Sequence, residues 1–147
     1  EKLEMTIFIS LSKANEKDKA KYYQELKKAQ RSLKITDWVV YFFNILQSAL
    51  DDTKNLVVFT LKKTNFFDCF KDQLNERQLK AINKMMEAGE DGFKGGMTAK
   101  KYISINKTSK ATATRDLQHL AEIQAFIKIG GGRSSAYQLN FEKSQNE

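Results

Sequence analysis

The sequence contains no proline and only seven glycines in 147 residues. Proline and glycine are the residues that most often interrupt regular structure, so their scarcity excludes a chain divided into many short elements. The glycines fall within residues 89–96 and 130–132, where we expect turns. The rest of the chain is suited to long helices, and helices should dominate the fold.

Cysteine occurs once, as Cys69, which excludes an internal disulfide. There is no run of about 18 apolar residues of the kind that spans a bilayer, and no start typical of a secretory signal. We therefore expect a cytoplasmic protein with no membrane partner. The chain begins at Glu1 without an initiating methionine, which predicts that it was cut from a larger protein.

Histidine also occurs once, as His119. One histidine and one cysteine, far apart in the sequence, cannot supply the ligand set of a zinc site. We expect His119 to be a surface or packing residue of a helix. Cys69 lies near Phe66, Phe67 and Phe70, so it should pack as a small apolar side chain. The sequence thus predicts no catalytic residue, no metal site and no cofactor in this chain.

The N-terminal half has the helical period. Residues 12–31 alternate charged and apolar side chains, as a surface helix does. Thr36 is suited to the N-cap of a second helix and Asp37 to its first turn, and the helix can run to about Phe59 or beyond. Two adjoining lines of apolar side chains follow it: Trp38, Phe42, Ile45, Ala49 and Leu56, and Val39, Phe43, Leu46, Leu50 and Val57. So wide a face needs several partners, and we expect it to pack on a domain outside this sequence or on a second copy.

Capping residues indicate three further helices. Asn75 and Gln78 have the spacing of a capping box, for a helix that ends near Ala88. Met97 is predicted to make a one-residue strand contact, and Thr98 to lead into the next capped helix. After a short turn at residues 106–108, Ser109 should cap a helix that runs to about Glu122. Two short helices joined by such a turn form a helix-turn-helix.

A β-hairpin should follow. Apolar residues suited to strands, Phe126, Ile127 and Ile129, precede the glycine run, and Ala136, Tyr137 and Leu139 follow it. After a helix-turn-helix, such a hairpin is a wing. The predicted fold class is therefore mainly α with a small β-hairpin: a helical segment over residues 1–73, a winged helix-turn-helix domain over residues 74–141, and a tail over residues 142–147.

The positive charge is concentrated in this domain. The formal net charge is +7, and residues 97–139 carry seven basic and two acidic side chains, a net +5. In the last helix Ala113, Leu117 and Leu120 share one face, so they should be buried and the opposite face should meet duplex DNA. The predicted DNA-binding residues are Lys107, Ser109, Lys110, Thr112, Thr114, Arg115, Gln118, Arg133 and Ser134. The alternative is a solvated face without a partner, because Glu122 would be repelled by phosphates.

Six segments in order resemble the C-terminal region of Fic-domain proteins: residues 10–14 (SLSKA), 22–26 (YYQEL), 35–38 (ITDW), 74–78 (LNERQ), 112–117 (TATRDL) and 130–134 (GGGRS). Together they extend over nearly the whole chain. The resemblance implies that a catalytic domain of the same protein transfers AMP from ATP, with Mg²⁺, to a hydroxyl group of a target protein. The family's catalytic loop, a histidine before Pro-Phe and a Gly-Asn-Gly-Arg stretch, does not occur here.

One position departs from the family. Relatives tend to have a glycine just after the last helix, where this chain has Gln124. A left-handed turn there must be made by a non-glycine residue or be avoided.

Two functions remain open at this point. In the first, the winged helix binds duplex DNA, with Lys110, Thr114, Arg115 and Gln118 in the major groove and Lys107 and Arg133 on phosphates, and it regulates the attached AMP-transfer domain. In the second, it is an interaction module that supports dimerisation or substrate presentation. Winged helices serve both roles. The concentrated charge favours DNA.

Overall fold

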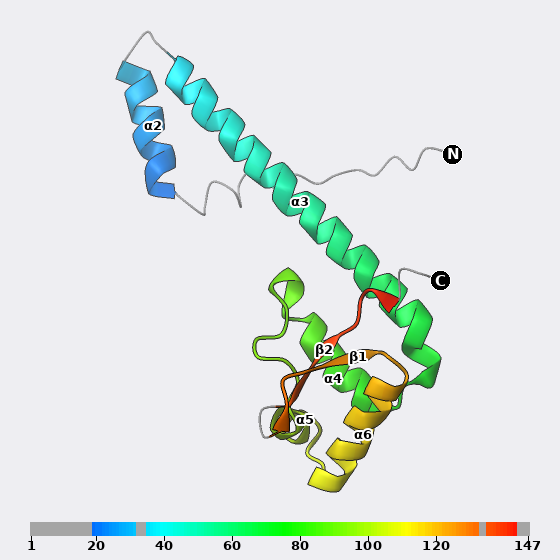
Figure 1. The fold of residues 1–147 in the computed structure, drawn as a ribbon. Helices are drawn as coiled ribbons and strands as arrows, with labels where there is room; N and C mark the ends of the chain where they lie inside the picture. The colour runs from blue at the N-terminus through cyan, green and yellow to red at the C-terminus, as the bar shows by residue number, and fades with distance from the viewer. Residues whose placement is uncertain (1–18, 32–34, 133–134, 144–147) are drawn as a thin grey trace, which may run out of the picture. The chain divides into compact units, whose positions relative to one another are not determined.

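The computed structural model describes residues 19–31, 35–132 and 135–143. Its elements, in order, are α2 (Lys19–Arg31), α3 (Thr36–Phe70), the 3₁₀ turn η1 (Lys71–Gln73), α4 (Glu76–Met86), the 3₁₀ turn η2 (Gly89–Asp91), α5 (Ala99–Asn106), α6 (Lys110–Glu122), β1 (Phe126–Ile129) and β2 (Ala136–Leu139) (Figure 1). The fold is mainly α with one small hairpin, as predicted. None of the described helices is long and apolar enough to cross a membrane.

The chain forms two compact units, Glu1–Val57 and Val58–Glu147. The first contains α2 and the start of α3. Tyr22 of α2 and Trp38 of α3 pack edge to face, with ring centroids 5.6 Å apart, and Ile45 and Ala49 are buried. The second apolar line of α3 stays largely in solvent, since Phe43 is 62% exposed.

The structure bears on two expectations for the N-terminal half. The part of the first predicted helix over residues 12–18 lies outside the described residues, whereas its end at Arg31 is confirmed. The prediction of Thr36 as an N-cap is wrong by one residue. Thr36 is already helical, because the carbonyl of Ile35 accepts the first helical hydrogen bond from Val39 N at 2.9 Å.

The second unit is organised around one core. It begins at Val58 rather than at the expected residue 74, because Phe66 and Phe70 near the end of α3 are buried in this core. The other buried members come from α4 to β1: Ala81, Ile82, Met85, Met86, Met97, Tyr102, Ala113, Leu117, Leu120, Ala125 and Phe126. This core fixes α4, α5 and α6 against one another.

Local capping explains where these helices begin. The Asn75 side chain accepts a hydrogen bond from Gln78 N, and the Gln78 side chain accepts one from Asn75 N, so the predicted capping box is confirmed. Ser109 caps α6 as predicted, and the side chain of Thr98 caps α5 by accepting a hydrogen bond from Lys101 N. The turn between them is shifted by one residue, because Asn106 is still helical and Lys107 takes the left-handed conformation with φ 51°.

The hairpin pairs antiparallel, with Phe126 opposite Leu139 and Ile129 opposite Ala136. Met97 adds the predicted single strand contact, through bonds of 2.7 and 2.9 Å with Tyr137. The preceding Gly96 is required there: its φ is 64°, and a Cβ would lie 2.8 Å from the Tyr137 carbonyl oxygen.

Candidate nucleic-acid interface

Helix α6 has one buried and one exposed face, as its sequence predicts. Ala113, Leu117 and Leu120 are buried in the core. Exposed on the other side are Lys110, Ala111, Thr114, Arg115 and Gln118. The core therefore fixes which side chains of α6 are available to a partner.

The basic side chains near the start of α6 are not engaged in ion pairs in the described part of the chain. Within the part of the chain that the structure describes, no ion pair involves Lys107, Lys110 or Arg115. Glu122 is exposed, but it lies at the opposite end of α6 from Lys110. A negatively charged partner can therefore approach the N-terminal half of α6 without displacing an ion pair.

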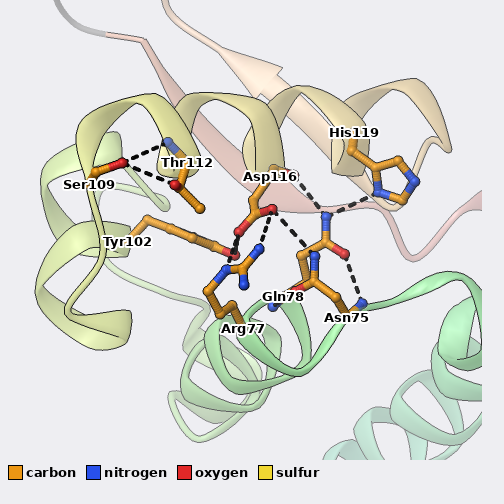
Figure 2. A network of polar contacts seen from close by, with 8 residues as sticks. All are labelled: Asn75, Arg77, Gln78, Tyr102, Ser109, Thr112, Asp116 and His119. Atoms are coloured by element: carbon orange, nitrogen blue, oxygen red, sulfur yellow. Dashed lines mark hydrogen bonds and ion pairs between the residues drawn. The ribbon is translucent and has the colours of Figure 1, made fainter.

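Two of the predicted DNA-binding residues have a structural role in the cap. Ser109 Oγ accepts a 3.1 Å hydrogen bond from Thr112 N and lies 3.0 Å from Thr112 Oγ1 (Figure 2). Thr112 is half-buried, and its hydroxyl is within hydrogen-bonding distance of Ser109 Oγ, so a partner would have to share it with the cap. The Thr114 hydroxyl donates to the Lys110 carbonyl at 2.9 Å, which leaves its lone pairs and methyl group for a partner.

The Asp116 carboxylate is the centre of a polar network that sequence reasoning missed. Its oxygens accept hydrogen bonds from Arg77 Nε at 2.8 Å, Arg77 Nη2 at 3.2 Å, the Tyr102 hydroxyl at 2.9 Å and Asn75 Nδ2 at 3.3 Å. Figure 2 shows these side chains converging on Asp116 from α4 and α5. One carboxylate of α6 thus links this helix to α4 and to α5.

The network alters the ionisation of its members. Burial alone would raise the pKa of the Asp116 carboxyl, but hydrogen bonds from Arg77 and Tyr102, with the charge of Arg77, together hold that pKa below its usual value. Burial, and then the bond to Asp116, raises the pKa of the Tyr102 hydroxyl. The bond to Asp116 also raises the pKa of Arg77. At neutral pH the network contains an ion pair and a neutral phenol.

Gln78 extends the network along α6. Its Nε2 lies 3.1 Å from the Asp116 carbonyl, to which it donates, and 3.0 Å from His119 Nδ1. His119 thus packs against α4, as predicted, and it does so through a polar contact with Gln78. The capping box was the only sequence signal at Gln78, and it gave no indication of partners about forty residues away in the chain.

A shallow pocket of about 440 Å³ opens beside α6. One side is formed by Gln73, Asn75, Arg77 and Gln78, and the other by Arg115, Asp116 and His119 of α6. Its charged groups are two guanidinium groups and one carboxylate. The pocket therefore carries a net positive charge next to the exposed face of α6.

The wing is described only in part. Arg133 and Ser134 lie outside the described residues. The turn before β1 is made by Gln124 with φ 61°, so the left-handed conformation expected at this position is present without a glycine. The Asn140 side chain donates to the Gln124 carbonyl at 2.9 Å, which supports this turn.

Cys69 is half-buried and packs against the core, as predicted. Among the described residues, no three His, Cys, Asp or Glu side chains are grouped so that they could hold a metal ion. The described surface offers charge and hydrogen-bonding groups for binding.

Comparison with known proteins found no family model that matches this chain and no significantly similar curated protein. The resemblance to Fic-domain proteins therefore rests on the six segments alone.

Proposed function

We propose that the C-terminal unit is a winged helix that binds duplex DNA through the exposed face of α6. The observation that carries the proposal is the division of this helix: the core buries Ala113, Leu117 and Leu120, so Lys110, Arg115 and Gln118 are left in solvent. An amide and two cations on one helix face match the base edges and phosphates of a major groove.

The packing of the domain supports this function. A recognition helix must be held rigidly, because a misplaced side chain loses its hydrogen bonds to the bases. Here Asp116 joins α6 to Arg77 of α4 and to Tyr102 of α5. The side of α6 away from DNA is thus fixed by the core and by the network.

As part of the same proposal, the chain is the non-catalytic region of a cytoplasmic Fic-type protein. The winged helix would then direct or regulate an attached AMP-transfer domain, which would use ATP and Mg²⁺. This part rests on the six resembling segments. It is independent of the DNA-binding proposal, which rests on α6.

A second candidate function is protein interaction by the N-terminal unit. Several large apolar side chains on the first part of α3 are exposed, among them Val40 at 55% and Phe43 at 62%. An apolar stripe of this kind is typical of a surface that contacts another protein. It favours an additional role in association. The DNA-binding proposal for α6 does not depend on this role.

Fluorescence anisotropy tests the DNA proposal. The chain is titrated into a pool of short labelled duplexes at two salt concentrations, together with the double variant Lys110→Ala/Arg115→Ala. The matched control is Lys54→Ala/Lys63→Ala, which removes the same charge from exposed positions of α3.

We expect binding that weakens steeply with salt, by about 0.9 in the logarithmic slope for each phosphate neutralised. The α6 double variant should lose affinity by about tenfold or more, and the control should stay close to wild type. An equal loss of affinity in both double variants would mean that binding depends only on the total charge of the chain, and the proposal would be wrong.

A further inference from the structure

The pocket beside α6 is lined by two arginines, and only one of them, Arg77, is paired with the carboxylate of Asp116. Its acid, Asp116, is only 5% exposed and is bonded to Arg77, Tyr102 and Asn75. Arg115 is exposed on the opposite wall and has no ion-pair partner among the described residues. Arg115 therefore brings to the lining of the pocket a positive charge that no ion pair of the described residues compensates.

Arg77 keeps hydrogen-bonding capacity toward the same space. Its Nε and Nη2 atoms are bonded to Asp116, yet the side chain is 46% exposed. A guanidinium group has five N–H donors, so others remain for an additional acceptor. The pocket thus has unused donors from two arginines, and two arginines with free N–H groups are suited to a tetrahedral oxyanion.

We infer that this pocket binds a phosphate group, and that the group is a phosphodiester of the DNA backbone at one edge of the major groove. The inference rests on the proposed function and deepens it. Arg115 lines the pocket and belongs to the exposed face of α6, so a phosphate in the pocket and bases opposite α6 can be contacted at the same time. Phosphate contacts fix the register of a protein on DNA without reading sequence.

This assignment changes the role that the sequence predicted for Arg115. It is a phosphate ligand, and base reading belongs to Lys110 and Gln118. Gln118 lies three residues after Arg115, a neighbouring position on the same helix surface, and it does not line the pocket. An amide can bond bidentately to adenine, whereas a phosphate contact needs only positive charge and donors.

The test compares Arg115→Ala, Arg115→Lys and Gln118→Ala on two duplexes, the one that binds most tightly and a scrambled duplex of the same composition. Arg115→Ala should weaken binding to both by the same factor and lower the salt slope by about one. Arg115→Lys should recover most of that slope. Gln118→Ala should reduce the preference for the first duplex and leave the slope unchanged.

Two results would overturn the inference. If Arg115→Ala weakens only the preferred duplex, Arg115 reads a base. If the salt slope of Arg115→Ala equals that of wild type, the side chain does not contact a phosphate.

A second arm separates failure of this inference from failure of the DNA proposal. Inorganic phosphate is titrated into the chain without DNA and followed by NMR, with chloride at the same ionic strength as the reference. We expect shifts at the side-chain Nε–H of both Arg115 and Arg77. The shift of Arg77 should disappear in Arg115→Ala, and both shifts should persist in Lys128→Ala, a control on β1. If inorganic phosphate binds but no duplex does, the ligand of the pocket is a free phosphate compound, and its assignment to the DNA backbone is wrong. No duplex binding and no specific shift would overturn the pocket itself.

Discussion

The Tyr102 hydroxyl of α5 donates a 2.9 Å hydrogen bond to Asp116 Oδ2 of α6, and both side chains are buried. A buried carboxylate is tolerated only when its oxygens are bonded and its charge is paired. Arg77 of α4 forms the ion pair with this carboxylate. Asp116 thus adds a polar link between α4, α5 and α6 to the apolar core that packs them together.

Replacing Asp116 by alanine should therefore destabilise the domain. The change leaves the buried Tyr102 hydroxyl without its acceptor and removes the partner of Arg77, which should lower the free energy of unfolding by about 1 to 3 kcal/mol. Urea denaturation measures this difference. Tyr102→Phe is the control, because it removes one hydrogen bond and keeps the ion pair, so its loss should be smaller. A loss as large in Tyr102→Phe as in Asp116→Ala would contradict the central role of the carboxylate.

Stability should also depend on pH through Asp116. Its pKa is lowered in the folded state, so its contribution is present above the unfolded value, near 3.8, and is lost as the pH falls through the folded value. Wild type should therefore lose more stability than Asp116→Asn as the pH is lowered from about 5 into this acidic range. Denaturation of both proteins across that range is the measurement. Parallel curves would show that Asp116 does not titrate with folding.

Substitutions at Ser109 should separate the cap of α6 from DNA binding. Ser109→Ala removes the acceptor of Thr112 N and should cost about 0.5 to 2 kcal/mol of stability. Ser109→Asp can still accept that bond, so its melting temperature should stay near wild type while its DNA affinity falls, because a carboxylate at this end of α6 repels phosphates. Thermal unfolding and anisotropy give the two readouts. Unchanged DNA affinity in Ser109→Asp would place this end of α6 away from DNA.

The exposed apolar line of α3 predicts self-association. Phe43→Asp puts a charge on a side chain that is 62% exposed and should convert an associated chain to a monomer, measured by light scattering after gel filtration. Asn44→Asp adds the same charge at the next, exposed position and should leave the mass unchanged. A wild-type chain that is already monomeric at high concentration would rule out a second copy as the partner of this face.

Features encoded by neighbouring residues were predictable from the sequence. The Asn75–Gln78 capping box and the cap at Ser109 each depend on a few consecutive positions. Local chemistry was sufficient at these places because a cap satisfies backbone groups within its own first turn.

Features that depend on distant residues were not predictable in this way. Arg77 and Asp116 are 39 positions apart, and neither lies in a pattern that indicates the other. Phe66 continues the period of a helix that starts in the N-terminal half, and only packing shows that it belongs to the C-terminal core. The exposed face of α6 was predictable because its buried face was, whereas the pocket required the arrangement of α4 against α6.

The most direct test of the central claim is an NMR map of the amide groups that respond to a short duplex. We predict that the largest shifts cluster in the N-terminal half of α6, at Lys110, Thr114 and Arg115, and continue to Gln118. The exposed residues of α2 and of the first part of α3 should not respond. Shifts that cluster on α3, or that spread evenly over all basic side chains, would contradict the assignment of α6 as the DNA-binding helix.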